Sequence, residues 1–341
     1  MSKLTNSKSR ILFFDIAKGV SIIAVVLGHI MPTDVGLNIF ISSWHVPAFF
    51  IINGMLLSYT NYSEKSFTKI LITGLMRLII PYFCFGMLLL LTRWGFSGFD
   101  IFTLRWQLID LLFFYGIGAN WFLPAMFFAQ VIYFITKRIS LSIQTRFPFL
   151  KHRVLLTFIG LCFFSLPFAF SPELVIIKVL FRAFIGTFFI IIGDLTISII
   201  LKIKNSTSNK SKIFLFLICI SFNVLVFILT NRQNVSLYLL KIGNPLIYFI
   251  CAILGTLSLI FFSLIIEGLS DNNLICKILM FFGLQSLNIM GTHQALMLLL
   301  FIPEQENYLL NIALCILILI AELPIIFIIK KITSFFKRKV A

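Results

Sequence analysis

The sequence has few charged residues, and very few of them are acidic. Only 12% of its 341 residues are charged, and 12 Asp and Glu stand against 28 Lys and Arg. Soluble globular domains carry about 25% charged and about 45 to 50% apolar residues, whereas 60% of this chain is apolar. A soluble globular fold is therefore excluded, and the composition is that of a chain dissolved in lipid.

Cysteines and long connections are scarce as well. The six cysteines stand singly, most of them inside apolar runs, and no two have the spacing of metal ligands. We therefore expect them to be small buried hydrophobic residues, with no disulfide framework and no metal site. The longest connections, residues 93–119 and 137–153, leave no room for a soluble catalytic domain. The sequence thus predicts one transmembrane domain over residues 1–341, with basic cytoplasmic tails at 1–10 and 331–341.

Long apolar runs fill most of the chain. A transmembrane helix needs roughly 20 mostly apolar residues, and ten segments come close to this length. They lie at about residues 11–31, 39–60, 71–92, 120–136, 154–170, 179–201, 213–230, 244–266, 278–301 and 308–329. The sequence therefore predicts an all-α integral membrane protein, a bundle of about ten transmembrane helices.

The positive charges indicate how this bundle is oriented. Cytoplasmic loops are enriched in Lys and Arg, and a cytoplasmic N terminus places 22 of the 28 basic residues in alternate connections and in both tails. The net charge of +16 then follows from topology and requires no nucleic-acid partner. Richness in Phe, Ile, Lys and Asn is typical of AT-rich bacterial genomes. We expect a multi-pass protein of the bacterial cytoplasmic membrane with both termini in the cytoplasm.

The first apolar segment carries three ionisable residues on one helical face. Lys18 and His29 are eleven residues apart, which is three turns plus ~20°, and Asp15 lies ~40° from His29. The rise between Lys18 and His29 is ~16 Å, so Asp15 cannot bond directly to His29 within the helix. This array suits a long ligand with an anionic head near the cytoplasm and a reactive end deeper in. Alternatively, Asp15 and Lys18 form an intrahelical pair and His29 lies at the outer interface.

Other polar residues inside the spans also allow two interpretations. His45 and Asn53 in the second segment belong either to a site or to an interface and a helix-packing position. Trp121 either stacks on a sugar ring or anchors the chain in the aromatic belt. His293 lies deep in the ninth segment, where the cost of a polar group in lipid favours a cavity-facing position.

Three further charges have no assigned function. Arg182 and Asp194 are ~18 Å apart along one helix and cannot pair. Glu322 is expected to accept a hydrogen bond from a neighbouring helix.

Several motifs resemble those of the membrane acyltransferase 3 family. They are Asp15-Ile-Ala-Lys18-Gly19 followed by His29, then Trp44-His45-Val-Pro47-Ala-Phe49-Phe50 with Asn53-Gly54, then Asn120-Trp121-Phe122-Leu123-Pro124, and finally Gln285-Ser-Leu-Asn-Ile-Met-Gly-Thr-His293. The resemblance covers about residues 10–330. It is strongest to the group that includes sugar O-acetylases of the fucose 4-O-acetylase type.

The resemblance implies transfer of an acetyl group from cytoplasmic acetyl-CoA to a hydroxyl of a cell-envelope carbohydrate, such as a capsule, an O-antigen or a related glycan. It implies that His29 is the general base and that Asp15, also assigned to the catalytic residues, orients Lys18. Many members have Arg where this chain has Lys18, so the charge is kept but bidentate phosphate recognition is lost.

The resemblance also implies where the two substrates bind. Lys18 and Arg77 would hold the phosphates of acetyl-CoA, and Lys69 would supply the charge of a family arginine whose position is Gly74 in this chain. The acceptor, a glycan or a lipid-linked sugar, would bind beside His45, Asn53, Trp121 and His293. Membrane lipid is the other expected partner.

A transporter or flippase of a lipid-linked sugar is the alternative function. It too would place charges inside a ten-span bundle, but such proteins more often show repeated halves with broken helices in matching positions. The two halves of this sequence show no such correspondence. The acyltransferase interpretation is therefore preferred.

Overall fold

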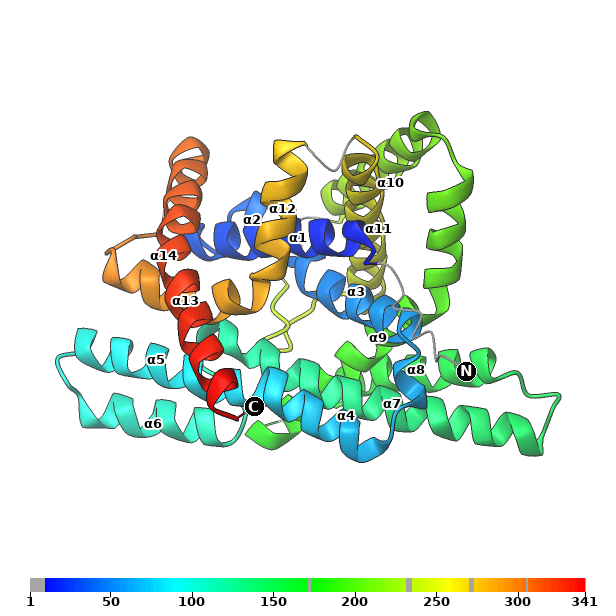
Figure 1. Cartoon of the computed structure of the whole chain (residues 1–341), viewed down its shortest axis with the longest axis horizontal. Coiled ribbons are helices and arrows are strands. Elements are labelled where there is room, and N and C mark those ends of the chain that lie inside the picture. Colours follow the sequence, from blue (N-terminus) through cyan, green and yellow to red (C-terminus); the bar gives the residue numbers. More distant parts are fainter. Residues whose placement is uncertain (1–9, 171–172, 231–234, 270–272, 305, 341) are drawn as a thin grey trace.

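The computed structural model describes residues 10–170, 173–230, 235–269, 273–304 and 306–340 (Figure 1). All its long elements are helices. They are α1 (Leu12–Ile30), α2 (Gly36–Ser42), α3 (His45–Tyr59), α4 (Phe67–Gly74), α5 (Ile80–Phe96), α6 (Ile101–Leu112), α7 (Phe122–Arg146), α8 (His152–Ala169), α9 (Val175–Ser206), α10 (Asn209–Leu229), α11 (Pro245–Glu267), α12 (Leu274–Leu284), α13 (Ser286–Leu299) and α14 (Tyr308–Val340). Three short turns join them: η1 (Tyr62–Glu64), η2 (Leu75–Ile79) and η3 (Gly118–Trp121).

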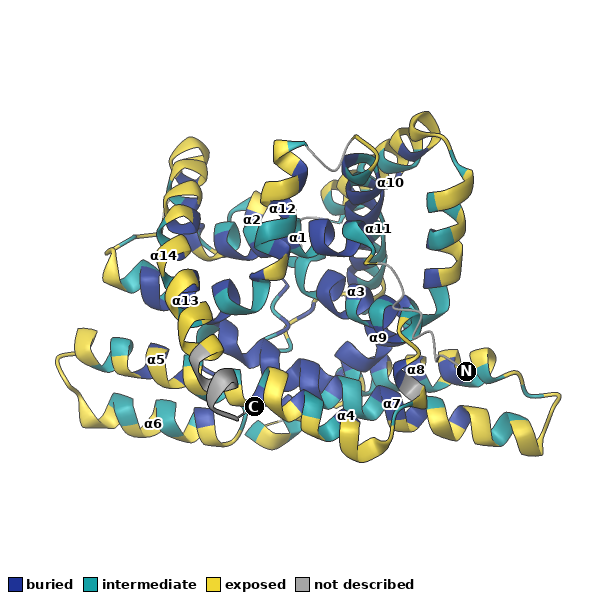
Figure 2. Cartoon of the chain, in the orientation of Figure 1, coloured by how far each residue is buried: buried dark blue, intermediate teal, exposed yellow. Residues whose placement is uncertain are grey.

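Most of these helices are suited to a membrane. Within the described residues, nine spans are long and apolar enough to cross a bilayer, and the bent pair α12 and α13 brings the number to ten. Exposed residues run along α10 and α14 (Figure 2), and many of them are large and apolar. Leu229 is 72% exposed and Leu309 is 80% exposed. Exposure of such side chains is unfavourable in water but not in lipid. The predicted all-α membrane bundle is confirmed.

Three of the predicted spans are interrupted. The second consists of α2 and α3, broken at Ser43 and Trp44. The third contains the π-helical turn η2 before Pro81, because proline has no N–H to donate to the preceding turn. The ninth is not one helix, since α12 and α13 are bent by 78° at Gln285.

Other boundaries differ from the predicted ones. The fourth span continues to Arg146, so Lys137, expected in a loop, lies within α7, where it forms an ion pair of 2.9 Å with Asp194 of α9. The connection at residues 93–119 contains α6, which starts where the Asp100 carboxylate accepts bonds from two backbone N–H groups.

Cysteine burial was only partly predicted correctly. Cys84 and Cys162 are exposed and the other four cysteines are buried.

Of the predicted tails, residues 1–9 and Ala341 lie outside the described residues. The cytoplasmic location of both termini and the single domain over 1–341 stay predictions.

Close helix crossings hold the polar part of α1 in place. A Cβ at Gly19 would overlap the carbonyl of Leu279 on α12, and one at Gly283 would overlap the carbonyl of Asp15. Small residues at such crossings let two backbones approach each other, as is common between membrane helices. A similar close approach joins α3 to α9, where a Cβ at Gly54 would overlap the carbonyl of Ile190. The crossing of α1 and α12 therefore fixes the segment that carries Asp15 and Lys18.

Candidate active site

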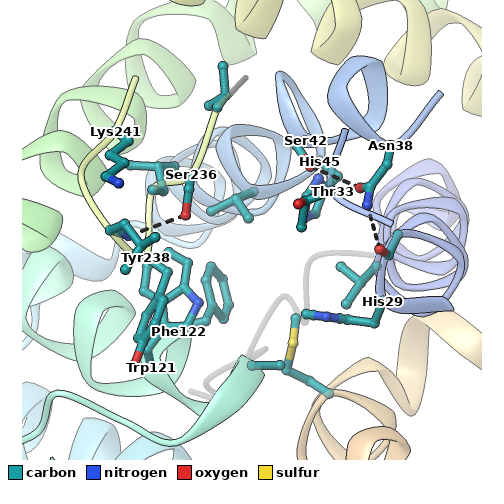
Figure 3. A pocket seen from close by; sticks show the side chains of 18 residues that line it. His29, Thr33, Asn38, Ser42, His45, Trp121, Phe122, Ser236, Tyr238 and Lys241 are labelled. Atoms are coloured by element: carbon teal, nitrogen blue, oxygen red, sulfur yellow. Dashed lines mark hydrogen bonds between the residues drawn. The ribbon is translucent and has the colours of Figure 1, made fainter. Parts of the chain in front are cut away.

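The larger of two neighbouring cavities, called here the histidine cavity, has a volume of about 410 Å³. Its polar lining consists of His29, Thr33, Asn38, Ser42, His45, Trp121, Ser236, Tyr238 and Lys241 (Figure 3). These residues come from α1, the segment that follows it, α2, α3, η3 and the connection between α10 and α11. His29, His45 and Trp121, which the sequence assigns to the site, thus meet at one cavity.

The smaller cavity, called the lysine cavity, has a volume of about 130 Å³. Lys18, Asn53, Gln130 and Ser286 are its polar residues, and the rest of its lining is apolar. Gln130 Nε2 donates to Asn53 Oδ1 at 3.1 Å, which leaves the other half of each amide for a ligand. Asn53 therefore lies with Lys18 in this cavity, whereas the sequence interpretation placed it with His45.

Phe122 and Met290 separate the two cavities, because each of them lines both. Both residues are buried. The ring of Phe122 is held by Phe49 and Phe50 of α3, with ring centroids 5.5 and 5.2 Å away. A ligand that reached from Lys18 to His29 would have to pass this pair.

Asp15 forms ion pairs near the start of α1. Its carboxylate lies 2.8 Å from Lys18 Nζ and 2.7 Å from the Arg10 guanidinium. The intrahelical pair of Asp15 and Lys18 that the sequence allowed is therefore present. His29 is ~21 Å farther along the helix, so Asp15 acts on Lys18 and not on His29.

His29 is in contact with α13. The Gln294 amide Nε2 lies 3.2 Å from His29 Nδ1, and Gln294 Oε1 accepts a bond of 2.8 Å from the backbone N–H of Ala119. The ring of His293 lies beside it, with ring centroids 5.2 Å apart. His29 is nevertheless exposed, because it opens onto the histidine cavity.

His45 and His293 each bond to a backbone carbonyl. His45 Nδ1 lies 2.7 Å from the Ile41 oxygen, and His293 Nδ1 lies 2.7 Å from the Ile289 oxygen. His45 lines the histidine cavity, whereas His293 is fully buried behind His29 and lines neither cavity.

Glu322 also acquires a partner on α13. Thr292 Oγ1 lies 2.8 and 2.9 Å from its two carboxylate oxygens, so the predicted bond from a neighbouring helix is confirmed.

Arg182 supports an aromatic wall of the histidine cavity. Its guanidinium is buried, donates to the carbonyls of Tyr115 and Tyr238, and lies over the rings of Tyr115, Trp121 and Tyr238 at 4.2, 5.4 and 4.7 Å. Burial raises the pKa of the Tyr238 phenol to about 12, so its hydroxyl is neutral near pH 7. The sequence assigned no function to Arg182, because its partners lie in two distant connections.

Lys69 and Arg77 lie outside both cavities. Both are exposed, on α4 and η2, and they line neither cavity. Of the three cations predicted to hold the donor, only Lys18 lines one of these two cavities.

Sequence reasoning also missed Asn38 and Gln294. Asn38 Nδ2 donates to the carbonyls of Gly28 and Met31, tying α2 to the end of α1. Gln294 directly follows His293, and this adjacency was the one signal available for it.

Comparison with known proteins shows the family. A family model described as an acyltransferase domain matches residues 11–331, nearly the whole chain. No curated protein and no solved structure matches the chain significantly. The helical membrane architecture and this match agree with each other, and the chain belongs to the acyltransferase 3 family of membrane acyltransferases.

Proposed function

We propose that this membrane acyltransferase moves an acetyl group from cytoplasmic acetyl-CoA to a hydroxyl of a cell-envelope carbohydrate. The carbohydrate is a polymer such as a capsule or an O-antigen, or its lipid-linked precursor, and the enzyme acts in the bacterial cytoplasmic membrane. The fucose 4-O-acetylase type of sugar O-acetylase is the group that its motifs resemble.

The observation that carries this proposal is the pair of cavities that meet at Phe122 and Met290. Lys18 lines the smaller cavity, and the larger one is lined by His29 and His45 together with Lys241. Lys18 and His29 lie ~16 Å apart on α1, a distance that the flexible pantetheine arm of CoA can span. Such an arrangement lets a donor from one face of the membrane meet an acceptor from the other.

The lysine cavity suits the pantetheine arm. Its apolar walls match the methylene groups of the arm, and the free halves of the Asn53 and Gln130 amides match its two amide groups. Asp15 holds the ammonium group of Lys18, which lines this cavity and would meet the phosphates. Arg77 and Lys69, exposed on the neighbouring segment, bind the outer part of the nucleotide.

The histidine cavity suits a sugar. Trp121 and Tyr238 present aromatic faces, and Thr33, Ser42 and Ser236 present hydroxyl groups. A small number of placed polar groups among aromatic side chains is the usual construction of a ligand pocket. The reaction needs a group that takes the hydroxyl proton in the transition state, which contributes roughly 10²- to 10⁴-fold. His29, the base that the family resemblance implies, and His45 both face this cavity.

The test is the acetyl content of the envelope glycan. Glycan from a deletion strain should lose one acetyl group per repeat unit by mass spectrometry, and a plasmid copy of the gene should restore it. Membrane vesicles should then incorporate radiolabel from acetyl-CoA into glycan. Unchanged acetylation in the deletion strain would refute the proposal.

A flippase for a lipid-linked sugar is the second candidate. The bent pair α12 and α13 favours it, because transporters build their sites from broken helices. A flippase predicts that the deletion strain accumulates unpolymerised lipid-linked sugar with its acetyl groups intact. Loss of acetyl groups from a polymer of normal length excludes it.

A further inference from the structure

The histidines around the histidine cavity differ in which ring nitrogen carries the proton. A carbonyl oxygen can only accept a hydrogen bond. His45 Nδ1 lies 2.7 Å from the Ile41 carbonyl oxygen, so Nδ1 carries the proton and Nε2 keeps its lone pair in the neutral ring. Within the described part of the chain, no hydrogen bond occupies this Nε2, and His45 lines the cavity. His45 therefore offers a free proton acceptor.

His29 has the opposite arrangement. The Ala119 N–H donates to Gln294 Oε1, and this fixes the orientation of the amide so that its NH₂ group faces His29. The amide NH₂ can only donate, so His29 Nδ1 accepts and the neutral ring carries its proton on Nε2. If His29 were protonated, its Nδ1–H would point at this NH₂ group, and two donors would oppose each other. His29 is therefore a donor through Nε2.

His293 is excluded as the acceptor of the proton by its position. Its Nδ1 donates to the Ile289 carbonyl, and its Nε2 has no hydrogen-bond partner among the described residues. Its side chain is fully buried behind His29 and does not line the cavity. A sugar hydroxyl in the cavity meets His45 and His29 first.

On the basis of the proposed acetyl transfer, we propose that His45 takes the proton of the sugar hydroxyl, while His29 donates from Nε2 to the thioester carbonyl oxygen. Gln294 positions His29 for this function. The hydroxyl oxygen forms a bond to the acetyl carbon, and its proton passes to His45 Nε2. The negative charge that develops on the carbonyl oxygen is met by His29 Nε2–H. The bond from carbon to sulfur then breaks, and the thiolate takes the proton from His45, which yields the sugar ester and CoA.

Substitutions at His45 and at His29 separate the two histidine functions. In His45→Asn, the side-chain amide reproduces the Nδ1 donor toward Ile41 but has no group in the place of Nε2. We expect the rate to fall about 10²- to 10³-fold, the size of a lost proton acceptor. In His29→Gln, the amide NH₂ takes the place of Nε2–H and cannot act as a base. We expect this variant to keep its rate within about 10-fold, whereas His29→Ala, with no donor, should lose about 10²- to 10³-fold.

The measurement is the initial rate at which membrane vesicles transfer radiolabel from saturating acetyl-CoA to glycan, normalised to the enzyme amount by immunoblot. The acid limb of the pH profile, where the proton acceptor becomes protonated, should be present in His29→Gln and absent in His45→Asn. His293→Asn serves as the matched control and should keep its acid limb.

Three outcomes would overturn this assignment. One is a rate of His45→Asn within threefold of wild type, and another is a His29→Gln variant as inactive as His29→Ala. The third is loss of the acid limb in His293→Asn instead of His45→Asn. Each of these outcomes would contradict the functions assigned to the histidines without contradicting acetyl transfer by the wild-type enzyme. Failure of the wild-type enzyme to transfer label from acetyl-CoA would refute the proposed function itself.

Discussion

Gln294 Nε2 lies 3.2 Å from His29 Nδ1, and the opposite end of the same amide is held by the N–H of Ala119. One glutamine thus joins η3 and α13 to the end of α1. Gly118 makes room for it, because a Cβ at Gly118, whose φ is +54°, would overlap Gln294 Oε1. This contact decides which hydrogen-bonding function His29 has.

Replacing Gln294 by Glu tests that contact directly. A carboxylate accepts from both Ala119 and His29, so it moves the His29 proton from Nε2 to Nδ1. We expect Gln294→Glu to lose about 10²-fold in acetyl transfer, as for a missing oxyanion donor. Gln294→Ala, which leaves His29 free to adopt either form, should lose less. If His29 were instead the general base, the carboxylate would orient it for that function, and Gln294→Glu would match or exceed Gln294→Ala.

Lys18 is expected to act on the donor. It lines the lysine cavity and is held at 2.8 Å from Asp15. A charged hydrogen bond contributes about 1.5 to 3 kcal/mol, so Lys18→Ala should raise the KM for acetyl-CoA about 10- to 100-fold. Lys210→Ala, on the exposed start of α10, is the control and should leave this KM unchanged. A donor KM that does not move in Lys18→Ala would contradict the assignment.

Arg77 provides a second test of the donor side. It is exposed and lines neither cavity, yet the family pattern assigns it to the donor. We expect Arg77→Ala to raise the KM for acetyl-CoA less than Lys18→Ala does, because an exposed charge contributes about 0.2 to 1 kcal/mol. The same titration of acetyl-CoA measures both variants. A larger effect for Arg77 would place the main phosphate contact outside the lysine cavity.

The sequence predicted which residues share a helix face but not which other segments they contact. The 3.6-residue period places Lys18 and His29 on one side of α1, and the structure directs them to two adjoining cavities. Arg182 could not be interpreted, because its partners Tyr115 and Tyr238 lie in connections without periodicity. The bend at Gln285 was also missed, since hydropathy does not register a change of direction.

Arg182 is expected to stabilise the wall of the histidine cavity. Arg182→Met would leave the carbonyls of Tyr115 and Tyr238 without their donors, at a cost of about 1 to 3 kcal/mol for each buried group. The free energy of unfolding should fall, with a lower Tm in detergent. The KM for the acceptor should rise while the KM for acetyl-CoA stays constant. Arg182→Lys, which offers one donor nitrogen in place of the two that Arg182 uses, should recover part of both losses. An equal rise in the two KM values would contradict this prediction.

Met290 is expected to control passage between the two cavities. It lines both of them together with Phe122, and it is buried. A tryptophan at this position would fill the space between Lys18 and His29, so the acetyl group could not reach the histidine cavity. Met290→Trp should therefore lower kcat for acetyl transfer by at least about 10²-fold, consistent with the loss that a displacement of ~1 Å can cause. Equilibrium dialysis with labelled CoA should show that the nucleotide still binds.

The control for this substitution is Met297→Trp, on the same helix but lining neither cavity. It adds the same bulk to α13 and should retain most of the acetyl transfer, provided that immunoblots show equal amounts in the membrane. Phe122→Ala is the complementary change, because it widens the passage instead of closing it. Water should then reach the acetyl group, and vesicles should release free acetate from acetyl-CoA without acceptor. A fully active Met290→Trp variant would show that donor and acceptor meet by another route.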